Sequence, residues 1–424
     1  MIDSVMDTVP TPTTAHVPVA AFDVCGALPT GTTVLEASAG TGKTFTIASL
    51  AVRYVAEGHA ELQELMLVTF GREATQELRE RVRERLGAVE RALRDPRAAR
   101  TSVDGIAALL ATVDDNEVAR RRDRLTRALA QFDAATIATT HQFCQQMLAG
   151  LGVAGDSDPD ARFTESVEEL LTEVVDDFYV RKYGGRPEHG PEVRAPGTPA
   201  FSRKEALELA RRAVHDEQAR LEPRAAEPGS TADVRYRFAS AVRAEVARRK
   251  RERRLYTYDD MLTRLAAALT DPARGAVQRL RSRFRVVLVD EFQDTDPVQW
   301  DILRTAFHGA VTLVLIGDPK QAIYAFRGAD VRSYLDATEL ACHHATLATN
   351  WRSDAPLLDA MAQVFGDVAL GNERITVHPV GAAYPAARMA GVPMRVRVLG
   401  RTGLPAARPP RRVVAPPARP AVAA

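Results

Sequence analysis

A run of small residues near the N-terminus, ending in Lys and Thr, restricts the fold of this chain more than any other feature. It reads Ala-Ser-Ala-Gly-Thr-Gly-Lys-Thr from Ala37 to Thr44, a P-loop with Ala in place of the first Gly. Small residues let backbone N–H groups close around phosphates, and a helix beginning near Lys43 points its positive end at them. The run lies between a predicted strand, 32–36, and a predicted helix, 45–55. This context favours a phosphate site over a chance Gly-rich turn.

The P-loop predicts ATP and Mg²⁺ as cofactors. We expect Lys43 to reach the β- and γ-phosphates and the Thr44 hydroxyl to hold Mg²⁺. The residues expected to line the nucleotide are Ala37, Ser38, Ala39, Gly40, Thr41, Gly42, Lys43, Thr44 and Phe45.

The apolar run 285–290 is a further predicted strand. An acidic pair, Asp290 and Glu291, lies at its end. A carboxylate at a buried strand end is the expected second anchor for the metal, so Asp290 is the predicted Mg²⁺ ligand. Glu291 is placed to orient and deprotonate the attacking water. Alone, an acidic pair would be only a solvated turn. Its distance along the chain from Lys43 exceeds that of a minimal nucleotide fold, so an insertion must lie between them.

Apolar runs of strand length alternate with helical patterns, which predicts an α/β fold with a parallel sheet. The expected strands are 32–36, 65–70, 135–140, 285–290 and 312–318. The expected helices among them include 45–55, an amphipathic segment around 78–93, and 141–148.

Changes in composition and in hydrophobic pattern divide the chain into six expected segments. They are a mobile leader, 1–30; the first part of an α/β domain, 31–150; a charged helical insertion, 151–280; the second part of the α/β domain, 281–348; the start of a second domain, 349–400; and a disordered Pro/Arg/Ala tail, 401–424.

Bulk properties exclude some classes and leave others open. A net charge of +1 provides no global positive field, so any nucleic-acid binding must depend on local patches. The three cysteines lack metal-ligand spacing and fit a reduced, cytoplasmic compartment, and no apolar run could cross a bilayer. The stretch 248–254 has six basic residues in seven. A solvated helix face and a phosphate contact explain it equally well.

Seven blocks in order resemble the RecB-type (UvrD/Rep-like) DNA helicases of superfamily 1. The blocks are Glu36–Thr46, Val68–Arg79, Thr139–Cys144, Tyr258–Leu262, Asp290–Gln299, Gly317–Asp330 and Asn350–Ser353. The resemblance implies a RecA-like motor with a helical insertion and the start of a second RecA-like domain. It also implies ATP-driven 3′-to-5′ movement on DNA in recombinational double-strand-break repair. The implied partners are single-stranded DNA, duplex ends, and RecC- and RecD-like subunits. No association with a membrane is expected.

The resemblance also assigns roles to individual side chains. It makes Gln321 a sensor of the γ-phosphate and Arg352 a cation that approaches the γ-phosphate across the cleft between two motor domains. The single-strand track would comprise Phe70, Arg72, His141, Phe143, Tyr324, Phe326 and Arg327. Aromatic rings beside Arg suit stacking on unpaired bases, although Tyr324 could equally be a core ring and His141 a structural histidine. Asp259 and Asp260 fit helix capping or the orientation of neighbouring Arg residues better than metal binding.

The resemblance fades after about residue 380, and no later helicase block or nuclease carboxylate cluster follows. No Gln precedes Gln63, so an adenine clamp built on Gln upstream of the P-loop is absent. We therefore expect a truncated motor that binds ATP and DNA but hydrolyses slowly and does not unwind duplexes. The first alternative is an ATP- and DNA-binding protein without motor activity. The second is a P-loop kinase or transporter ATPase, which would leave 350–353 unexplained.

Overall fold

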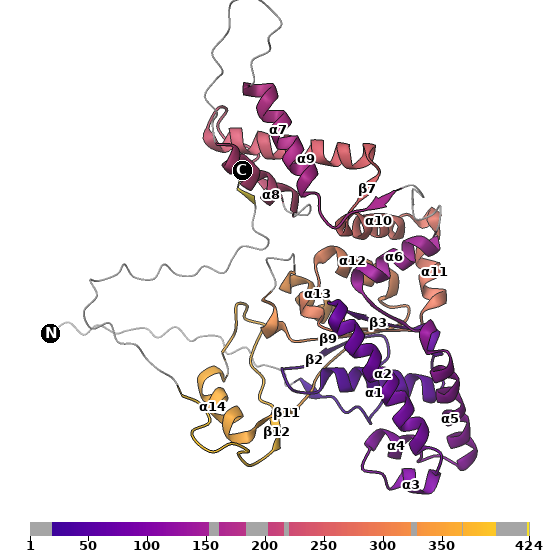
Figure 1. The fold of residues 1–424 in the computed structure, drawn as a ribbon. Helices are drawn as coiled ribbons and strands as arrows, with labels where there is room; N and C mark the ends of the chain where they lie inside the picture. Colours follow the sequence, from indigo (N-terminus) through magenta and orange to yellow (C-terminus); the bar gives the residue numbers. More distant parts are fainter. Residues whose placement is uncertain are drawn as a thin grey trace, which may run out of the picture.

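The computed structural model describes residues 19–151, 161–183, 202–215, 220–323, 329–366, 368–395 and 422–423. Its centre is a seven-stranded sheet in the order β1-β10-β2-β9-β8-β3-β4 (Figure 1), and every pairing in it is parallel. The strands are β1 (Ala20–Ala21), β2 (Thr32–Glu36), β3 (Leu65–Thr69), β4 (Thr136–Thr139), β8 (Val286–Val289), β9 (Thr312–Gly317) and β10 (His343–Thr346). The predicted α/β class and all five predicted strands are confirmed.

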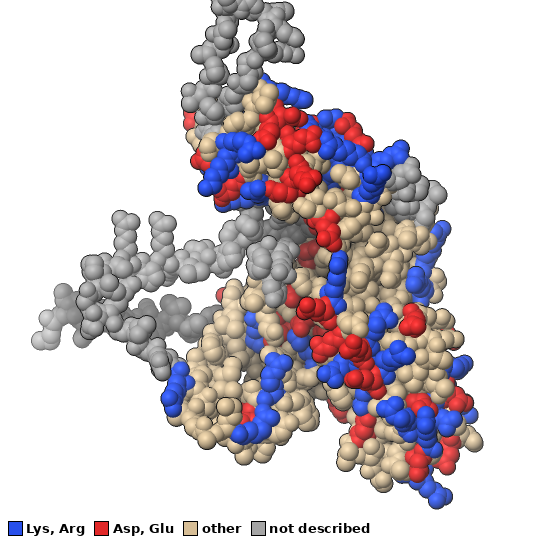
Figure 2. Space-filling view, viewed as in Figure 1, with Lys and Arg blue, Asp and Glu red and all other residues tan. Residues whose placement is uncertain are grey.

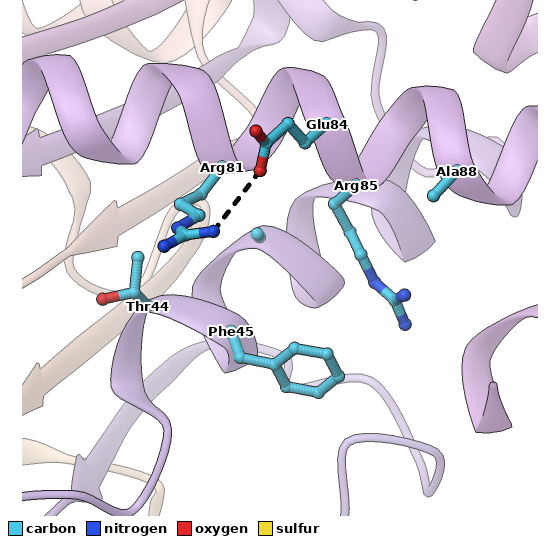
Figure 3. A pocket seen from close by; sticks show the side chains of 7 residues that line it. Thr44, Phe45, Arg81, Glu84, Arg85 and Ala88 are labelled. Atoms are coloured by element: carbon cyan, nitrogen blue, oxygen red, sulfur yellow. Dashed lines mark hydrogen bonds and ion pairs between the residues drawn. The ribbon is translucent and has the colours of Figure 1, made fainter. Parts of the chain in front are cut away.

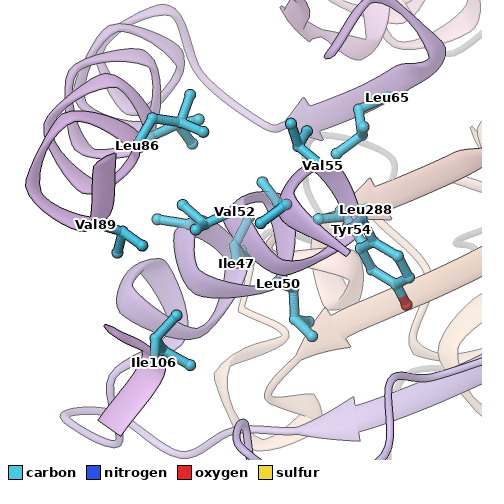
Figure 4. Packing of buried hydrophobic residues seen from close by; sticks show 14 of the residues in the cluster. Ile47, Leu50, Val52, Tyr54, Val55, Leu65, Leu86, Val89, Ile106 and Leu288 are labelled. Atoms are coloured by element: carbon cyan, nitrogen blue, oxygen red, sulfur yellow. The ribbon is translucent and has the colours of Figure 1, made fainter. Parts of the chain in front are cut away.

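Helices cover both faces of this sheet, so its central strands are buried throughout, as parallel strands usually are. One face packs against α1 (Lys43–Ala56), α2 (Arg72–Ala92), α3 (Pro96–Arg100), α4 (Gly105–Leu110) and α5 (Asp115–Ala130). Figure 4 shows the centre of this layer, where Ile47 and Val52 of α1 lie between the sheet and Leu86 and Val89 of α2. The three predicted helices correspond to α1, α2 and α6.

The opposite face packs against α6 (Thr140–Leu151), α10 (Tyr258–Thr270), α11 (Ala276–Arg283), α12 (Pro297–Phe307) and α13 (Val331–Leu340). Thr257 and Asp260 form a capping box at the start of α10, so the expected capping role of Asp260 is confirmed. Asp260 also pairs with Lys250, 2.7 Å away. The predicted insertion runs to residue 280, whereas α10 and α11, within that range, pack in the core of the sheet.

The insertion proper is a helical body with its own apolar core. It consists of α7 (Glu168–Tyr183), α8 (Arg203–His215) and α9 (Thr231–Glu252), and it lies at one end of the molecule in Figure 1. Two short strand pairs accompany it: β5 (Arg162–Phe163) with β7 (Leu255–Tyr256), and β6 (Leu221–Glu222) with β13 (Val422–Ala423).

Residues 19–30 form part of the main domain, so the expected mobile leader does not extend to residue 30. Here β1 adds an edge strand to the sheet, and Phe22, Val24 and Leu28 pack on the α1 side of the core. The buried Arg53 guanidinium donates to the carbonyls of Val24 and Gly26 at 2.8 and 2.7 Å. Sequence composition could not predict these hydrogen bonds, because their acceptors are backbone carbonyls, which every residue has.

After β10 the chain leaves the sheet and forms a small separate unit. It contains β11 (Thr349–Asp354), α14 (Ala355–Phe365) and β12 (Gly381–Tyr384), and β11 pairs with β12 in parallel. No residue of α14 is buried. Apart from β13, the predicted tail 401–424 lies outside the described residues. Within the described ranges, no helix is long and apolar enough to cross a membrane.

Candidate functional site

The P-loop connects β2 to α1 at the carboxyl edge of the sheet. Gly40 and Gly42 have φ values of 82° and 86°, a left-handed conformation that glycine adopts without the strain of a Cβ atom. The loop is anchored by the Ala37 N–H, which donates to the Gly317 carbonyl at 2.9 Å. The Thr41 hydroxyl donates to the Ser38 carbonyl at 2.7 Å. The result is an ordered loop followed directly by a helix N-terminus, the geometry that binds phosphate.

The predicted acidic pair follows β8, and its second member, Glu291, contacts the end of the P-loop. The Lys43 ammonium donates to Glu291 Oε2 at 2.7 Å, and the two side chains are 13% and 32% exposed. Glu291 has a φ of 50°, an uncommon left-handed conformation for a residue with a side chain. The two residues predicted to bind the γ-phosphate and to activate water, 248 positions apart in sequence, therefore lie together.

Asp290 is partly buried next to Glu291. Loss of hydration and the neighbouring Glu291 charge raise the pKa of Asp290 to about 6, although Lys43 acts in the opposite direction. Mg²⁺ usually binds through one or two carboxylates, water and substrate phosphates rather than in an all-protein cage. The donor set therefore fits Mg²⁺ bound together with a nucleotide.

Gln321 lies one strand away, in the short turn after β9. Its Nε2 donates to Asp318 Oδ2 at 2.7 Å, which holds the amide at the same edge of the sheet. A second amide, Gln293, connects this turn to the acidic pair. Its Nε2 donates to Glu291 Oε2 at 2.8 Å, and its Oε1 accepts from the Asp318 N–H at 2.9 Å. Sequence reasoning missed Gln293 because an amide within an acidic block resembles a turn residue.

The Asn350 block docks directly on the P-loop. Asn350 Nδ2 donates to the Ala39 carbonyl at 2.9 Å, and the Trp351 N–H donates to the Gly40 carbonyl at 2.8 Å. A Cβ atom added to Gly40 would lie only 2.7 Å from the Cβ of Arg352. The block that carries Arg352 is therefore in contact with the loop, and glycine at position 40 makes that approach possible.

Three of the residues predicted to contact DNA follow neighbouring strand ends. Arg72 is exposed and donates to the Tyr258 hydroxyl at 2.9 Å. The His141 ring packs edge-on against the Tyr258 ring, with centroids 4.7 Å apart. Phe70 directly follows β3 at the same edge of the sheet and is partly buried. Tyr258 was not predicted, although its place in the block 258–262 offered a signal.

Residues 23–341 match the family of the UvrD/REP helicase N-terminal domain. The chain belongs to the UvrD/REP helicase family. It is 50% identical over 386 residues to the RecBCD enzyme subunit RecB of Mycolicibacterium smegmatis, a match covering 90% of this chain and 34% of the relative. The corresponding subunit of Mycobacterium tuberculosis is 47% identical with the same coverage. That of Escherichia coli is 29% identical over 472 residues, covering 83% of this chain and 39% of the relative. The chain thus spans about a third of the length of the mycobacterial relatives.

Within this UvrD/REP domain, one predicted DNA contact is wrong. Phe143 has no exposed surface and packs in the core of the α6 face, 6.4 Å from the Phe307 ring centroid. A ring without exposed surface cannot stack on a base, so Phe143 is a core residue. The expected contacts Tyr324, Phe326 and Arg327 lie outside the described residues.

The basic stretch 248–254 is largely engaged in ion pairs. Arg249 is buried and contacts Glu173, Asp177 and Glu245 at 2.5–2.8 Å, and Arg253 pairs with Glu173 at 2.6 Å. Figure 2 shows positive and negative side chains intermixed over this helical body. These contacts favour an ion-paired helix face over phosphate binding, although Arg249 and Lys250 are buried rather than solvated.

Two exposed aromatic rings flank the P-loop. Phe45 is 52% exposed and Trp351 is 62% exposed. A Cβ atom on Gly42 would be 3.7 Å from Trp351 Cδ1 and 4.0 Å from the Phe45 Cβ atom. Large exposed aromatic side chains beside a phosphate loop are suited to stacking on a base. Trp351 was not predicted as a site residue, although an aromatic residue inside the Asn350 block was a usable signal.

A shallow pocket of about 320 Å³ adjoins Phe45. It is lined by Thr44, Phe45, Ala48, Arg81, Glu84, Arg85 and Ala88. Figure 3 shows the Phe45 ring directed toward Arg85, whose guanidinium carbon lies 4.9 Å from the ring centroid. Arg85 is in turn held by two hydrogen bonds to Asp104, at 2.6 and 2.7 Å. Phe45 is thus oriented by α2 at the mouth of the P-loop.

Proposed function

We propose that this chain carries the ATPase centre of a RecB-type DNA helicase that acts in recombinational double-strand-break repair. The observation that carries the proposal is the meeting of Lys43 with Glu291 at the edge of a parallel sheet. The family assignment supports a helicase motor. The mycobacterial relatives are named as subunits of the RecBCD enzyme, and we extend to this chain RecC- and RecD-like partners and 3′-to-5′ movement.

Nucleotide binding follows from the loop and its flanks. The α1 N-terminus and the P-loop N–H groups bind the phosphates, while Lys43 neutralises the β- and γ-oxygens. The base stacks at Phe45 and Trp351, which replaces a Gln-based clamp with aromatic surface. Thr44 and Asp290 hold Mg²⁺, which offsets negative charge on the phosphates when bound. The Asp290 carboxyl, which is poorly hydrated and lies beside a second carboxylate, fits that role because a cation stabilises its charged form.

Hydrolysis requires a positioned water and a response to the γ-phosphate. Glu291 leaves Lys43 when nucleotide binds, and its carboxylate then accepts a proton from the attacking water. Gln321 donates its amide to the γ-phosphate, and Arg352 neutralises charge that develops on it during transfer. Glu291 and Gln321 act from the carboxyl edge of the sheet, the usual ligand side of an open α/β fold. Arg352 acts from β11, which docks on the P-loop at that edge.

The DNA path proposed here runs over the same edge through Phe70, Arg72 and His141, with Tyr258 between them. Burial lowers the pKa of His141, so its ring is neutral at pH 7 and offers stacking surface rather than charge. Arg72 supplies the phosphate contact. Tyr324, Phe326 and Arg327 remain predicted contacts.

The test of the nucleotide site is titration calorimetry with Mg-ATP. Lys43→Ala should abolish binding, because the principal phosphate cation is lost, whereas Lys204→Ala on the exposed face of α8 should bind normally. Equal ATP affinity in the two variants would refute the site.

The test of the motor class is ATP hydrolysis with and without single-stranded DNA. A helicase ATPase accelerates when DNA binds, and Arg72→Ala should reduce that acceleration. Hydrolysis indifferent to DNA would instead indicate a P-loop kinase or transporter ATPase.

A further inference from the structure

A buried ionic cluster lies behind the P-loop and has no direct part in the proposed chemistry. Lys320, in the turn Pro319–Gln321 after β9, places its ammonium 2.6 Å from Glu36 Oε1 and 2.9 Å from Asp318 Oδ1. The side chains of Lys320, Glu36 and Asp318 are 12%, 7% and 3% exposed. Two carboxylates therefore share one ammonium almost completely out of water.

The two carboxylates stand at the starts of two functional loops. Glu36 ends β2 and directly precedes the P-loop, while Asp318 follows β9 and begins the turn that carries Gln321. Because β2 and β9 are adjacent in the sheet, Lys320 joins the base of one loop to the base of the other. Glu36 also faces His378 and His344, but at 3.5 and 3.9 Å. Lys320 thus makes the shortest ionic contact of Glu36 within the described part of the chain.

Asp318 connects Lys320 to the two groups proposed to act on the γ-phosphate and the water, Gln321 and Glu291. Its Oδ1 contacts Lys320, while its Oδ2 accepts the Gln321 amide at 2.7 Å. Its backbone N–H donates to Gln293, which donates in turn to Glu291. A carboxylate held at one oxygen by a buried cation has little freedom to rotate, so the amide bound at the other oxygen is also fixed in direction.

We propose that Lys320 is a positioning residue of the ATPase centre, which clamps Glu36 to Asp318 and so orients the Gln321 amide toward the γ-phosphate. The proposal rests on the nucleotide function proposed above. Its consequence is that Lys320 determines how well the site distinguishes a triphosphate from a diphosphate. A purely structural lysine would affect both nucleotides equally.

The first experiment compares the affinities of the whole chain for ATPγS and ADP, with Mg²⁺, in Lys320→Met. Methionine keeps the apolar stem and removes the charge. The ratio of the two affinities should fall about tenfold, since a hydrogen bond to a charged group contributes about that much. ADP binding should be preserved. Lys204→Met, exposed on α8, is the matched control and should leave the ratio unchanged. Equal loss for both nucleotides, or no ATPγS preference in the unaltered chain, would overturn the proposal.

The second experiment separates orientation from charge balance. Lys320→Met leaves two buried carboxylates unneutralised, so it should also lower Tm. Adding Glu36→Gln removes one of those charges and should recover part of Tm, but it should not restore the triphosphate preference. A preference restored together with Tm would overturn the positioning role.

The third experiment is a double-mutant cycle with Gln321→Ala. If Lys320 acts through Gln321, then the double variant should lose no more preference than Gln321→Ala alone. Additive losses would overturn the proposal. The proposed function itself is tested apart from this, since Lys43→Ala should abolish the binding of both nucleotides.

Discussion

Replacing Glu291 with Gln should have opposite effects on the binding and the hydrolysis of ATP. Glu291 has two partners: it pairs with Lys43 at 2.7 Å and accepts from Gln293 at 2.8 Å. A nucleotide must compete for Lys43 with this carboxylate. Glu291→Gln keeps the side-chain shape and weakens the competition, so ATP should bind as tightly as before or more tightly.

The size of the gain follows from the geometry of the pair. With side chains 13% and 32% exposed, the ion pair is only partly shielded from water. Such pairs stabilise by about 1 kcal/mol or less, which corresponds to at most about fivefold in ATP affinity. Hydrolysis should instead fall by about 10²–10⁴, the usual contribution of a general base.

The assay is calorimetric titration with Mg-ATPγS together with single-turnover hydrolysis of Mg-ATP. Glu252→Gln, at an exposed ion pair of α9, is the matched control and should change neither quantity. Hydrolysis at the unaltered rate would show that Glu291 is not the base. ATPγS affinity weakened more than tenfold would contradict the competition between the carboxylate and the γ-phosphate.

Three further substitutions test other parts of the site. Asp290→Asn should stabilise the nucleotide-free chain at pH 8, measured by urea unfolding. The folded-state pKa of about 6 lies above the ordinary 3.8, so the folded state holds the proton more tightly, and stability falls as the pH rises from about 4 to above 6. The shift corresponds to roughly 3 kcal/mol at most, and no gain at pH 8 would contradict it. Trp351→Ala should weaken the binding of ATP but not that of inorganic tripolyphosphate, because only ATP has a base that can stack. An equal loss of affinity for both ligands in titration calorimetry would exclude the stacking role. Phe143→Ala should cost about 3–5 kcal/mol of unfolding free energy as a core truncation, with the affinity of the folded fraction for single-stranded DNA unchanged; a selective loss of DNA affinity would reinstate the DNA contact.

The parts of the fold that the sequence predicts are those where burial and spacing coincide. The strands β3, β8 and β9 are buried on both faces and each carries four apolar residues in a row, which is a strong strand signal. The predicted limits agree with β2, β3, β4, β8 and β9 to within one residue. The attachment of residues 19–30 to the main domain could not be predicted, for the opposite reason. This attachment depends on carbonyls bound by Arg53 and on a two-residue edge strand, and neither leaves a periodic pattern.

The candidate site divides in the same way. Lys43 and Glu291 could be picked out as candidate site residues because phosphate and water chemistry demand those side chains beside a loop and a strand end, and the structure brings them together. Their proposed roles are tested by the substitutions above. Whether an aromatic side chain near a strand end faces solvent cannot be read from its neighbours. Phe143 and Tyr258 show this: α6 turns Phe143 into the core, while Tyr258 at the start of α10 contacts Arg72 and His141.

The contacts of the Asn350 block determine how nucleotide and domain position can be linked. Asn350 and Trp351 bind the carbonyls of Ala39 and Gly40, which belong to the loop that wraps the phosphates. We therefore expect a change in the loop on binding ATP to alter the attachment of β11 directly, without a relay through the core. The same block positions Arg352 beside Gly40, where a side chain would leave too little room. Gly40→Ala combines a disfavoured φ with that clash, and it should therefore disturb the docking of β11 together with phosphate binding, whereas a change confined to the phosphate side would leave β11 in place.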